Sequence, residues 1–328
     1  MKRISIYCLL MFCALLTASA QQTKQLVILH TSDTHSRIEP IDLHAADPYA
    51  GAGGVVRRAT FLKDFRTKNP DVLLFDCGDI SQGTPYYNLF RGEVEVQMMN
   101  LMGYDAMTIG NHEFDFGLDN MARLFRMAHF PVVCANYDVT GTVLEGLVKP
   151  YVVLERGGIK IGVFGVSPKM EGLVQADKCE GIVYNDPIVA AQEVTDLLRT
   201  KEGCDVVICL SHLGFRLKNE VCDEKLAAAT RGIDVILGGH SHTFMEKPAF
   251  LPECGGEEYS GIAHREKRHF CRRIGFDTDE GIADEKAVTV YTGYNGMLRA
   301  FCFGCETLSG YTYRCFPRRA VAGEVGSG

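Results

Sequence analysis

The chain has 328 residues, of which 46% are hydrophobic and 23% are charged, which is enough to bury one large core or two modest ones. Its formal net charge is −7, and it has no long run of lysine and arginine. Sequence-independent binding of a nucleic acid polymer needs clustered positive charge, so we exclude that class of partner.

The first twenty residues resemble an export signal. Lys2 and Arg3 give a positive start, residues 4–16 form an apolar run, and residues 18–20 are small enough for cleavage. The apolar run is too short to span a bilayer comfortably, and no other segment is long and apolar enough to do so. We therefore predict a signal peptide over residues 1–20, a secreted or periplasmic protein, and no stable membrane insertion. A retained anchor is the alternative.

Apolar runs of strand length alternate with segments of helical period along the next 230 or so residues. Such alternation is typical of an α/β layered domain. In chain order, the sequence predicts a strand at 26–29, a helix at 55–66, a strand at 72–75, a helix at 94–101, a strand at 106–109, a helix at 118–128, a strand at 131–135, a hairpin of 151–154 and 160–166 across two glycines, a helix at 187–199, and strands at 206–210 and 233–237. Asp186 is expected to cap the helix at 187, where Pro187 suits the first position.

Residues that bind metals follow five of these strands. In chain order they are Asp33 and His35, then Asp79, then Asn111, His112 and Glu113, then His212, and finally His240 and His242. Open α/β sheets bind ligands at the carboxyl ends of their strands, so we expect the five loops to meet at one rim. Each pair alone is weak, because such residues also occur as caps and turns.

The residue types favour metal ions over other ligands. Carboxylate, imidazole and amide oxygen together suit Zn, Mn, Fe or similar divalent ions, and none of the five loops offers the paired thiolates of a structural zinc site. Two neighbouring ions would need a shared carboxylate. We expect Asp79 to provide it, because it stands alone on its loop behind Gly78.

The order Asp-x-His, Gly-Asp, Gly-Asn-His-Glu, Ser-His and Gly-His-x-His resembles the calcineurin-like metallophosphoesterase superfamily. The wording LHTSDTH, GNHEFDFG, SHLG and GGHSHT is closer still to the metallophosphatase domain of the 5′-nucleotidase family. That family also includes 2′,3′-cyclic-nucleotide phosphodiesterases and UDP-sugar hydrolases. The resemblance covers roughly residues 24 to 247 and implies a four-layer α/β/β/α sandwich with two mixed β-sheets.

The resemblance also implies a role for each matching residue. One metal ion is expected on Asp33, His35 and His242, the other on Asn111, His212 and His240, and Asp79 between them. His112 would act on the leaving group, and Asp115 would orient His112. The alternatives are that His112 ligates a metal, that Asp115 caps the following helix, and that Glu113 only supports a ligating histidine by a hydrogen bond.

The function that the resemblance implies is hydrolysis of phosphate esters, with 5′-nucleotide phosphomonoesters as the substrates. Two ions lower the pKa of a water held between them, so a bridging hydroxide can attack the phosphorus in line with the leaving oxygen. Cyclic-nucleotide phosphodiesterase or nucleotide-sugar diphosphatase activity is the alternative within this chemistry. An inactive metal-binding domain is the alternative outside it.

Six cysteines fall within the same region. Cys77, Cys134 and Cys209 lie in or beside apolar runs and are expected to be buried hydrophobic side chains. Cys179, Cys204 and Cys222 lie in more polar stretches, where export would permit a disulfide.

The sequence changes character near residue 251, where the alternation fades. We expect the metallophosphoesterase domain to span residues 24–250 and residues 251–328 to be an atypical tail. Residues 253–272 read ECGGEEYSGIAHREKRHFCR. A nucleotide sequence encoding them can, one base later, encode NAEEKNIPVSHTGKKGIFVG, which is close to the family's continuation. We interpret the tail as the product of a frameshift near Pro252. A divergent but genuine extension is the alternative.

Family members that act on nucleotides usually carry a second, C-terminal domain that binds the base. We expect this nucleotide-binding domain to be absent from the chain, and a separately encoded domain is then a candidate partner, beside the small-molecule phosphate ester itself.

Overall fold

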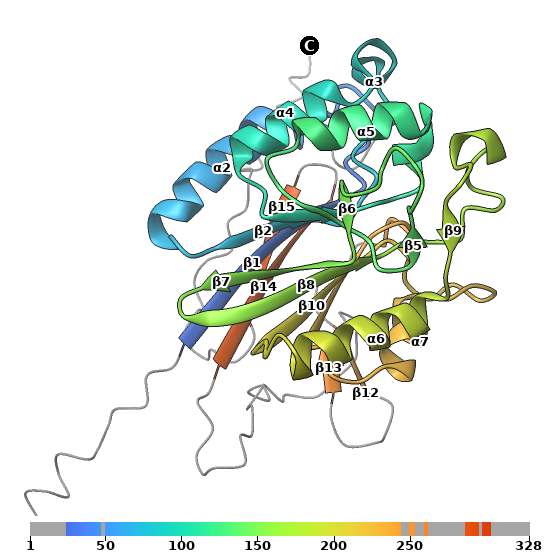
Figure 1. The fold of residues 1–328 in the computed structure, drawn as a ribbon. Helices are drawn as coiled ribbons and strands as arrows, with labels where there is room; N and C mark the ends of the chain where they lie inside the picture. The colour runs from blue at the N-terminus through green and yellow to red at the C-terminus, as the bar shows by residue number, and fades with distance from the viewer. Residues whose placement is uncertain are drawn as a thin grey trace, which may run out of the picture.

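The computed structural model describes residues 24–46, 50–243, 249–252, 259–261, 286–294 and 297–302. Within these residues the chain forms two mixed β-sheets that are covered by helices on their outer faces (Figure 1). The predicted sandwich of helix, sheet, sheet and helix layers is confirmed.

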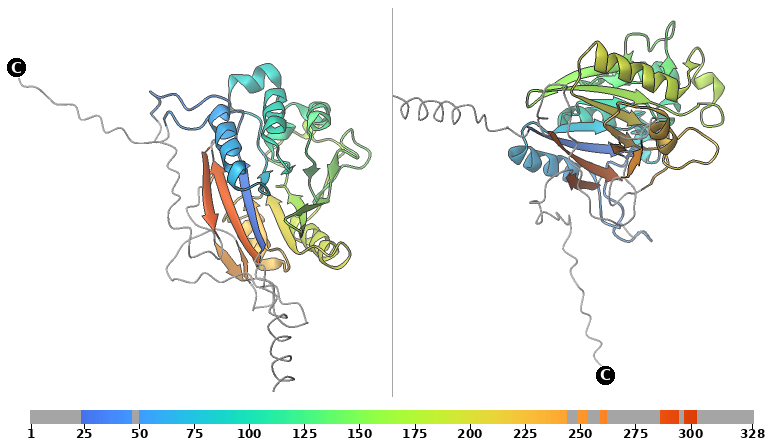
Figure 2. Two further views of the ribbon diagram at one scale, coloured as in Figure 1. Left: turned by 90° about the vertical axis from the view of Figure 1, so that its left-hand side faces the viewer. Right: turned by 90° about the horizontal axis from the view of Figure 1, so that it is seen from below.

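The first sheet has the strand order β15-β14-β1-β2-β3-β4-β6. Its strands are β1 (Lys24–Ser32), β2 (Leu73–Asp76), β3 (Ala106–Thr108), β4 (Val132–Val133), β6 (Val148–Lys149), β14 (Lys286–Tyr294) and β15 (Met297–Cys302). Neighbours pair in parallel except β14 and β15. Strand β14 lies beside β1 although more than 250 residues separate them in the sequence (Figure 2).

The second sheet has the order β12-β13-β11-β10-β8-β7. Its strands are β7 (Tyr151–Arg156), β8 (Ile159–Val166), β10 (Val206–Ser211), β11 (Val235–Gly238), β12 (Phe250–Pro252) and β13 (Tyr259–Gly261). Strands β7 and β8 form the predicted antiparallel hairpin, turning at Gly157 and Gly158, whose φ angles are 57° and 70°. A short ribbon pairs β5 (Tyr137–Asp138) with β9 (Val183–Tyr184).

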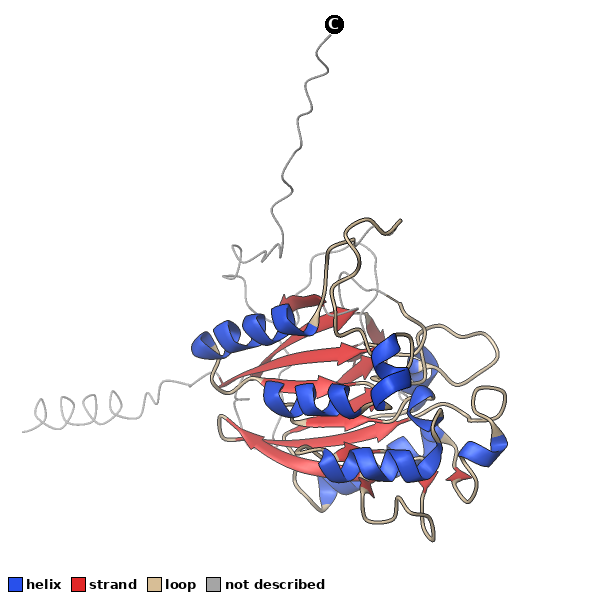
Figure 3. Ribbon diagram, turned by 90° about the horizontal axis from the view of Figure 1, so that it is seen from above, coloured by secondary structure: helices blue, strands red, loops and turns tan. Residues whose placement is uncertain are grey.

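Helices cover the outer face of each sheet (Figure 3). Over the first sheet lie α2 (Val55–Lys68), α3 (Pro85–Phe90), α4 (Glu93–Met102) and α5 (Gly117–Met127), and over the second lie α6 (Pro187–Thr200) and α7 (Asp223–Ala229). Single turns of 3-10 helix are η1 (His112–Phe114) and η2 (Ala176–Lys178). Asp186 caps α6 as predicted, since its Oδ1 accepts the backbone N–H of Ile188 at 2.8 Å and of Val189 at 3.1 Å.

Three hydrophobic layers hold the sheets and helices together. Because side chains alternate along a strand, Leu26 and Ile28 of β1 face the second sheet, whereas Val27 and Leu29 pack under the helices of the first. In β10 the side chains alternate in the same way: Val206 and Ile208 lie in the layer between the sheets, and Val207 and Cys209 lie under the helices of the second sheet. Strands buried on both faces are continuous apolar runs, which explains why they were recognisable in the sequence.

Several sequence predictions concern residues outside the described ranges or only partly within them. The signal peptide falls wholly outside. Of the tail after residue 252, only 259–261, 286–294 and 297–302 are described, so its origin stays a prediction. Cys77, Cys134 and Cys209 are buried as predicted, Cys179, Cys204 and Cys222 are free thiols, and no disulfide joins any of these six cysteines. Across the described ranges, none of the helices combines the length and apolar character needed to cross a bilayer.

Candidate metal centre

The predicted site residues lie on loops that follow the strands of both sheets. The loops after β1, β2 and β3 come from the first sheet, and those after β10 and β11 come from the second. At the rim where these strands end, the structure gathers two groups of side chains whose ligand atoms all lie within 4.8 Å of one another in each group. One consists of Asp33, His35 and His242, and the other of Asp79, His212 and His240.

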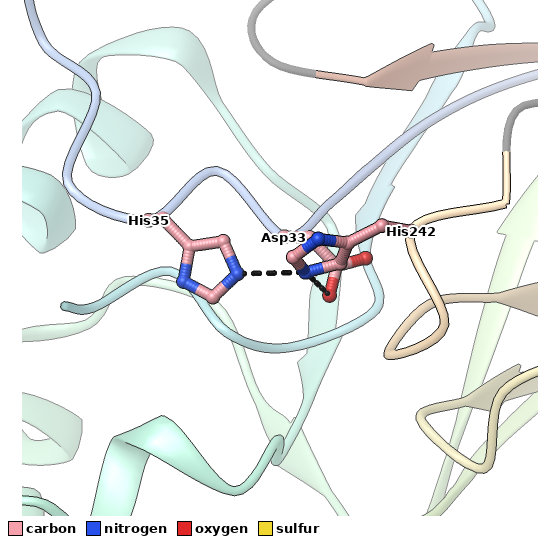
Figure 4. Close-up of side chains that lie close together, drawn as sticks. All are labelled: Asp33, His35 and His242. Carbon is pink, nitrogen blue, oxygen red and sulfur yellow. Dashed lines mark hydrogen bonds and ion pairs between the residues drawn. The ribbon is translucent and has the colours of Figure 1, made fainter. Parts of the chain in front are cut away.

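In the first group two imidazoles and a carboxylate converge (Figure 4). Nε2 of His35 lies 3.0 Å from Nε2 of His242, which in turn lies 3.4 Å from Oδ1 of Asp33. Nδ1 of His35 lies 3.2 Å from the carbonyl oxygen of Ser81. An imidazole that donates its Nδ1 proton to a carbonyl keeps a lone pair on Nε2, which is the atom that faces the group.

The second group is more deeply buried. Nδ1 of His212 lies 2.6 Å from the carbonyl oxygen of Cys77, and its Nε2 lies 3.0 Å from Oδ2 of Asp79. That Nε2 makes no hydrogen bond of proper geometry in spite of this distance. Oδ1 of Asn111 is also buried without a hydrogen-bond partner. Buried polar atoms rarely lack a hydrogen-bond partner, and two such atoms beside a carboxylate fit a site where a cation would bind.

The charges of the second group depend on each other. Burial would lower the pKa of His212, but the carboxylate of Asp79 raises it to about 10. Burial likewise would raise the pKa of Asp79, yet the neighbouring His212 holds it well below its ordinary value. Asp79 is therefore an anion at neutral pH, as a metal ligand must be.

Asp33 in the first group is also a buried carboxyl whose pKa is lowered by a neighbouring histidine. Burial opposes its charge, but the hydrogen bond from His242 keeps the pKa of this carboxyl below its ordinary value. Both oxygens of Asp33 also accept the backbone N–H of His240, at 3.0 and 3.2 Å. Asp33 thus links the two groups, since His240 belongs to the second.

His112 and Asp115 form a pair beside the two groups. Nδ1 of His112 lies 3.0 Å from Oδ2 of Asp115, and the two side chains are 30% and 33% exposed. The hydrogen bond to Asp115 raises the pKa of His112 above its ordinary value. The N-cap position of α5 is Phe116 rather than Asp115, and its side chain makes no capping hydrogen bond. His112 is in neither ligand group, although its ring centroid lies 5.4 Å from that of His35.

Five of the gathered residues have a left-handed backbone, which the sequence did not indicate. The φ angles are positive at Asp33 (51°), His35 (45°), Asp79 (56°), His240 (72°) and His242 (50°). Such a conformation costs about 1–3 kcal/mol for each residue that is not glycine and concentrates at functional sites. The fold holds these residues in place in spite of that cost.

Two glycines let the loops touch. A Cβ on Gly78 would lie 2.6 Å from the backbone N of Gly110 and 2.9 Å from Nδ1 of His212. A Cβ on Gly110 would lie 2.5 Å from the backbone N of Asp79. Real Cβ atoms do not approach other atoms so closely. The glycine before Asp79 therefore leaves room for Gly110 and His212.

Glu113 forms hydrogen bonds with backbone groups, and not with the ligating histidine that was the alternative for it. Its carboxylate accepts the backbone N–H groups of Asp79 (3.0 Å), Ile80 (2.9 Å) and Gly110 (2.5 Å). The sequence also could not reveal the carbonyls of Ser81 and Cys77 that orient two imidazoles, because every residue has a carbonyl and only the fold selects one.

Comparison with known proteins places this geometry in a family. A sequence model of the calcineurin-like phosphoesterase family matches residues 26–244. The snake venom 5′-nucleotidase of Crotalus adamanteus is 37% identical over 243 residues, which cover 71% of this chain and 40% of that protein. The solved structure of a 5′-nucleotidase precursor from Thermus thermophilus is similar with a TM-score of 0.64 and 32% identity, covering 72% of this chain and 47% of that one.

A second solved structure, the NAD nucleotidase of Haemophilus influenzae, is similar with a TM-score of 0.62 and 28% identity, over 72% of this chain and 49% of that one. The chain thus spans less than half the length of each of these three proteins. The family model, in contrast, matches more than half of this chain and includes both ligand groups. The protein therefore belongs to the calcineurin-like phosphoesterase family.

Proposed function

We propose that the protein hydrolyses phosphomonoesters, with 5′-nucleotides as substrates, at a site that holds two divalent cations. The observation that carries the proposal is the pair of ligand groups, each with a carboxylate and two imidazoles, at one rim of the two sheets. Zn, Mn and Fe suit these ligands, and the side chains do not discriminate among them.

One cation is assigned to Asp33, His35 and His242, and the other to His212, His240 and Asn111. Oδ1 of Asn111 and Nε2 of His212, which make no hydrogen bond, support the second set. Asp79 would be shared by the two ions, since it is anionic and belongs to the second group, while its Oδ1 also accepts the backbone N–H of His112 at 2.8 Å. When bound, two such ions polarise the phosphate oxygens and lower the pKa of a water.

His112 supplies the proton that the leaving oxygen needs. Its Nδ1 faces Asp115, so a protonated ring presents its Nε2–H to the substrate. Asp115 stabilises that protonated form, in agreement with the raised pKa of His112. An ester oxygen leaves poorly as an alkoxide, and protonation by a positioned imidazole is worth about 100- to 10,000-fold in rate.

Nucleotides are proposed as substrates because the relatives named above are called 5′-nucleotidases. The likeness to an NAD nucleotidase keeps a nucleotide with a diphosphate bridge as the second candidate. Either substrate would be met outside the cytoplasm if residues 1–20 act as an export signal.

We also propose that the catalytic domain spans residues 24–250 and that the tail from residue 251 arises from a frameshift. The gene sequence tests the second point. Codons that cannot encode the family's continuation one base later would refute the frameshift and leave a genuine extension.

The test of function combines metal content with a substrate panel. Purified protein reconstituted with Mn²⁺ or Zn²⁺ is expected to bind two ions and to release phosphate from AMP and p-nitrophenyl phosphate. Faster hydrolysis of cyclic nucleotides, nucleotide sugars or NAD than of AMP would show that one of these compounds, and not a 5′-nucleotide, is the preferred substrate. A folded protein that binds two ions without hydrolysing any of these compounds would be a metal-binding domain and not the proposed enzyme.

A further inference from the structure

Glu113 is a buried carboxylate that the proposed reaction does not use. It is 3% exposed and lies between two loops of the metal centre. Its Oε2 accepts the backbone N–H groups of Asp79 at 3.0 Å and of Gly110 at 2.5 Å, and its Oε1 accepts that of Ile80 at 2.9 Å. A single side chain thus satisfies three backbone donors from two separate loops.

Two of the three donors, Asp79 and Ile80, are successive residues of one turn, and the third, Gly110, lies on the other loop. Gly78 and Asp79 have φ angles of 91° and 56°, and a turn of this kind directs successive N–H groups toward one point. Such a concave set of amides binds anions, and in many proteins the anion is a phosphate. Here Glu113 fills the set from within the chain.

The two loops that Glu113 joins carry two of the proposed ligands. Asp79 donates its own backbone N–H to Glu113, and Asn111 directly follows Gly110, which does the same. Buried Asp76 also holds the first loop, accepting the N–H of Gly78 at 2.9 Å and the hydroxyl of Thr31 at 2.5 Å. Asp76 joins this turn to the neighbouring strand β1, whereas Glu113 joins it to the loop that carries Asn111.

We propose that Glu113 is a positioning residue for the metal ions: its three backbone hydrogen bonds fix Asp79 and Asn111 relative to each other, so that both side chains are in place before an ion arrives. This inference rests on the proposed function. Partners that orient metal ligands from behind typically contribute about 10- to 100-fold to metal affinity.

The variant that tests the proposal is Glu113→Gln, which keeps the shape of the side chain. The amide has one oxygen to accept hydrogen bonds and turns an NH₂ group toward N–H donors. We expect the affinity for Mn²⁺, measured by titration calorimetry on folded full-length protein, to fall by about 10- to 100-fold. At saturating Mn²⁺, kcat should recover most of its wild-type value, since His112 and Asp115 are unchanged.

Asp105→Asn is the matched control. Asp105 is also a partly buried carboxylate that accepts a backbone N–H, that of Leu74 at 2.8 Å, and it pairs with Arg156 at 2.6 Å. It precedes β3, whereas Glu113 follows that strand. A general loss of structural support would weaken Mn²⁺ binding in both variants and overturn the proposal, whereas the positioning role predicts weaker binding in Glu113→Gln alone.

A measurement on the wild-type protein covers the case in which Glu113→Gln does not fold. In protein stripped of metal, the amide protons of Asp79, Ile80 and Gly110 should exchange slowly with solvent, because Glu113 and not the ion holds them. Fast exchange that slows only on adding Mn²⁺ would overturn the proposal. Unchanged Mn²⁺ affinity in folded Glu113→Gln would refute the positioning role alone. Wild-type protein that binds no ion would refute the function and the inference together.

Discussion

At the scale of single residues, the site divides into atoms that face the two ligand groups and atoms that hold the rings from behind. His35 and His212 each turn Nδ1 toward a backbone carbonyl, of Ser81 and Cys77 respectively. His112 turns Nδ1 toward a carboxylate instead. A carbonyl partner at Nδ1 leaves Nε2 facing the ligand group, where a metal ion would bind, whereas an anionic partner favours the protonated ring, which would serve as an acid.

This difference predicts that His112→Ala retains two ions but loses turnover. We expect kcat to fall by about 100-fold or more, the usual contribution of a general acid. Metal content by atomic emission and steady-state kinetics check it, with the exposed His129→Ala as the control. Loss of one ion from His112→Ala would place His112 among the ligands.

Asp79→Ala is expected to act on both ions. Removing this carboxylate leaves His212 without its buried ionic partner and takes away the ligand that we assign to both cations. Metal content should fall from two ions to none per chain, with no phosphate release. Asp138→Ala, which removes an exposed carboxylate, should leave both ions bound. Retention of two ions by Asp79→Ala would refute the bridging role.

The sequence indicated the chemical identity of these side chains but not how they are held. Asp33, His35 and Asp79 were recognisable because each directly follows an apolar strand. Their left-handed φ angles were not, since a non-glycine residue adopts them only when the surrounding fold imposes them. The backbone contacts of Glu113 depend in the same way on two loops that meet only after folding.

At the scale of helices and strands, the length of an element decided whether it could be predicted from the sequence. Strands such as β10 and helices such as α6 carry enough apolar residues to show their period, and the structure has them within a few residues of the predicted bounds. Helix α3, helix α7 and the turn η1 are too short to show a helical period. Of these three elements, η1 carries His112 and Glu113.

The close packing of the loops after β2 and β3 predicts that a larger side chain at Gly110 destabilises the protein. Gly110→Ala would press a methyl group against the backbone of Asp79, so we expect a loss of about 1–3 kcal/mol in stability together with weaker Mn²⁺ binding. Denaturant unfolding and calorimetry measure the two effects. In Gly141→Ala a methyl group meets no atom within 4 Å, although φ is 76°, so this control should cost stability without changing metal affinity. Equal Mn²⁺ affinity in both variants would contradict the steric argument.

At the scale of the whole molecule, the ligand groups join the two sheets. Asp33 and His35 follow β1 of the first sheet, whereas His242 follows β11 of the second, and the second ligand group likewise combines Asp79 with His212. The apolar layer between the sheets holds them face to face, and the proposed ions would tie them at the rim (Figure 1). Sequence patterns predicted the individual strands, whereas their division between two sheets was implied only by the family resemblance.

This arrangement predicts that metal binding stabilises the whole fold. An ion that binds only the folded protein contributes RT ln(1 + [L]/Kd), or about 2.7 kcal/mol when its free concentration is 100 times Kd. Differential scanning calorimetry should therefore show a Tm that falls on adding EDTA and rises with Mn²⁺ concentration. His112→Ala should keep the full rise and Asp79→Ala should lose it, because only the second variant lacks a proposed ligand. A Tm that is independent of Mn²⁺ in the wild-type protein would mean that the two sheets are held by their apolar layer alone, and that the side chains at the rim do not bind ions.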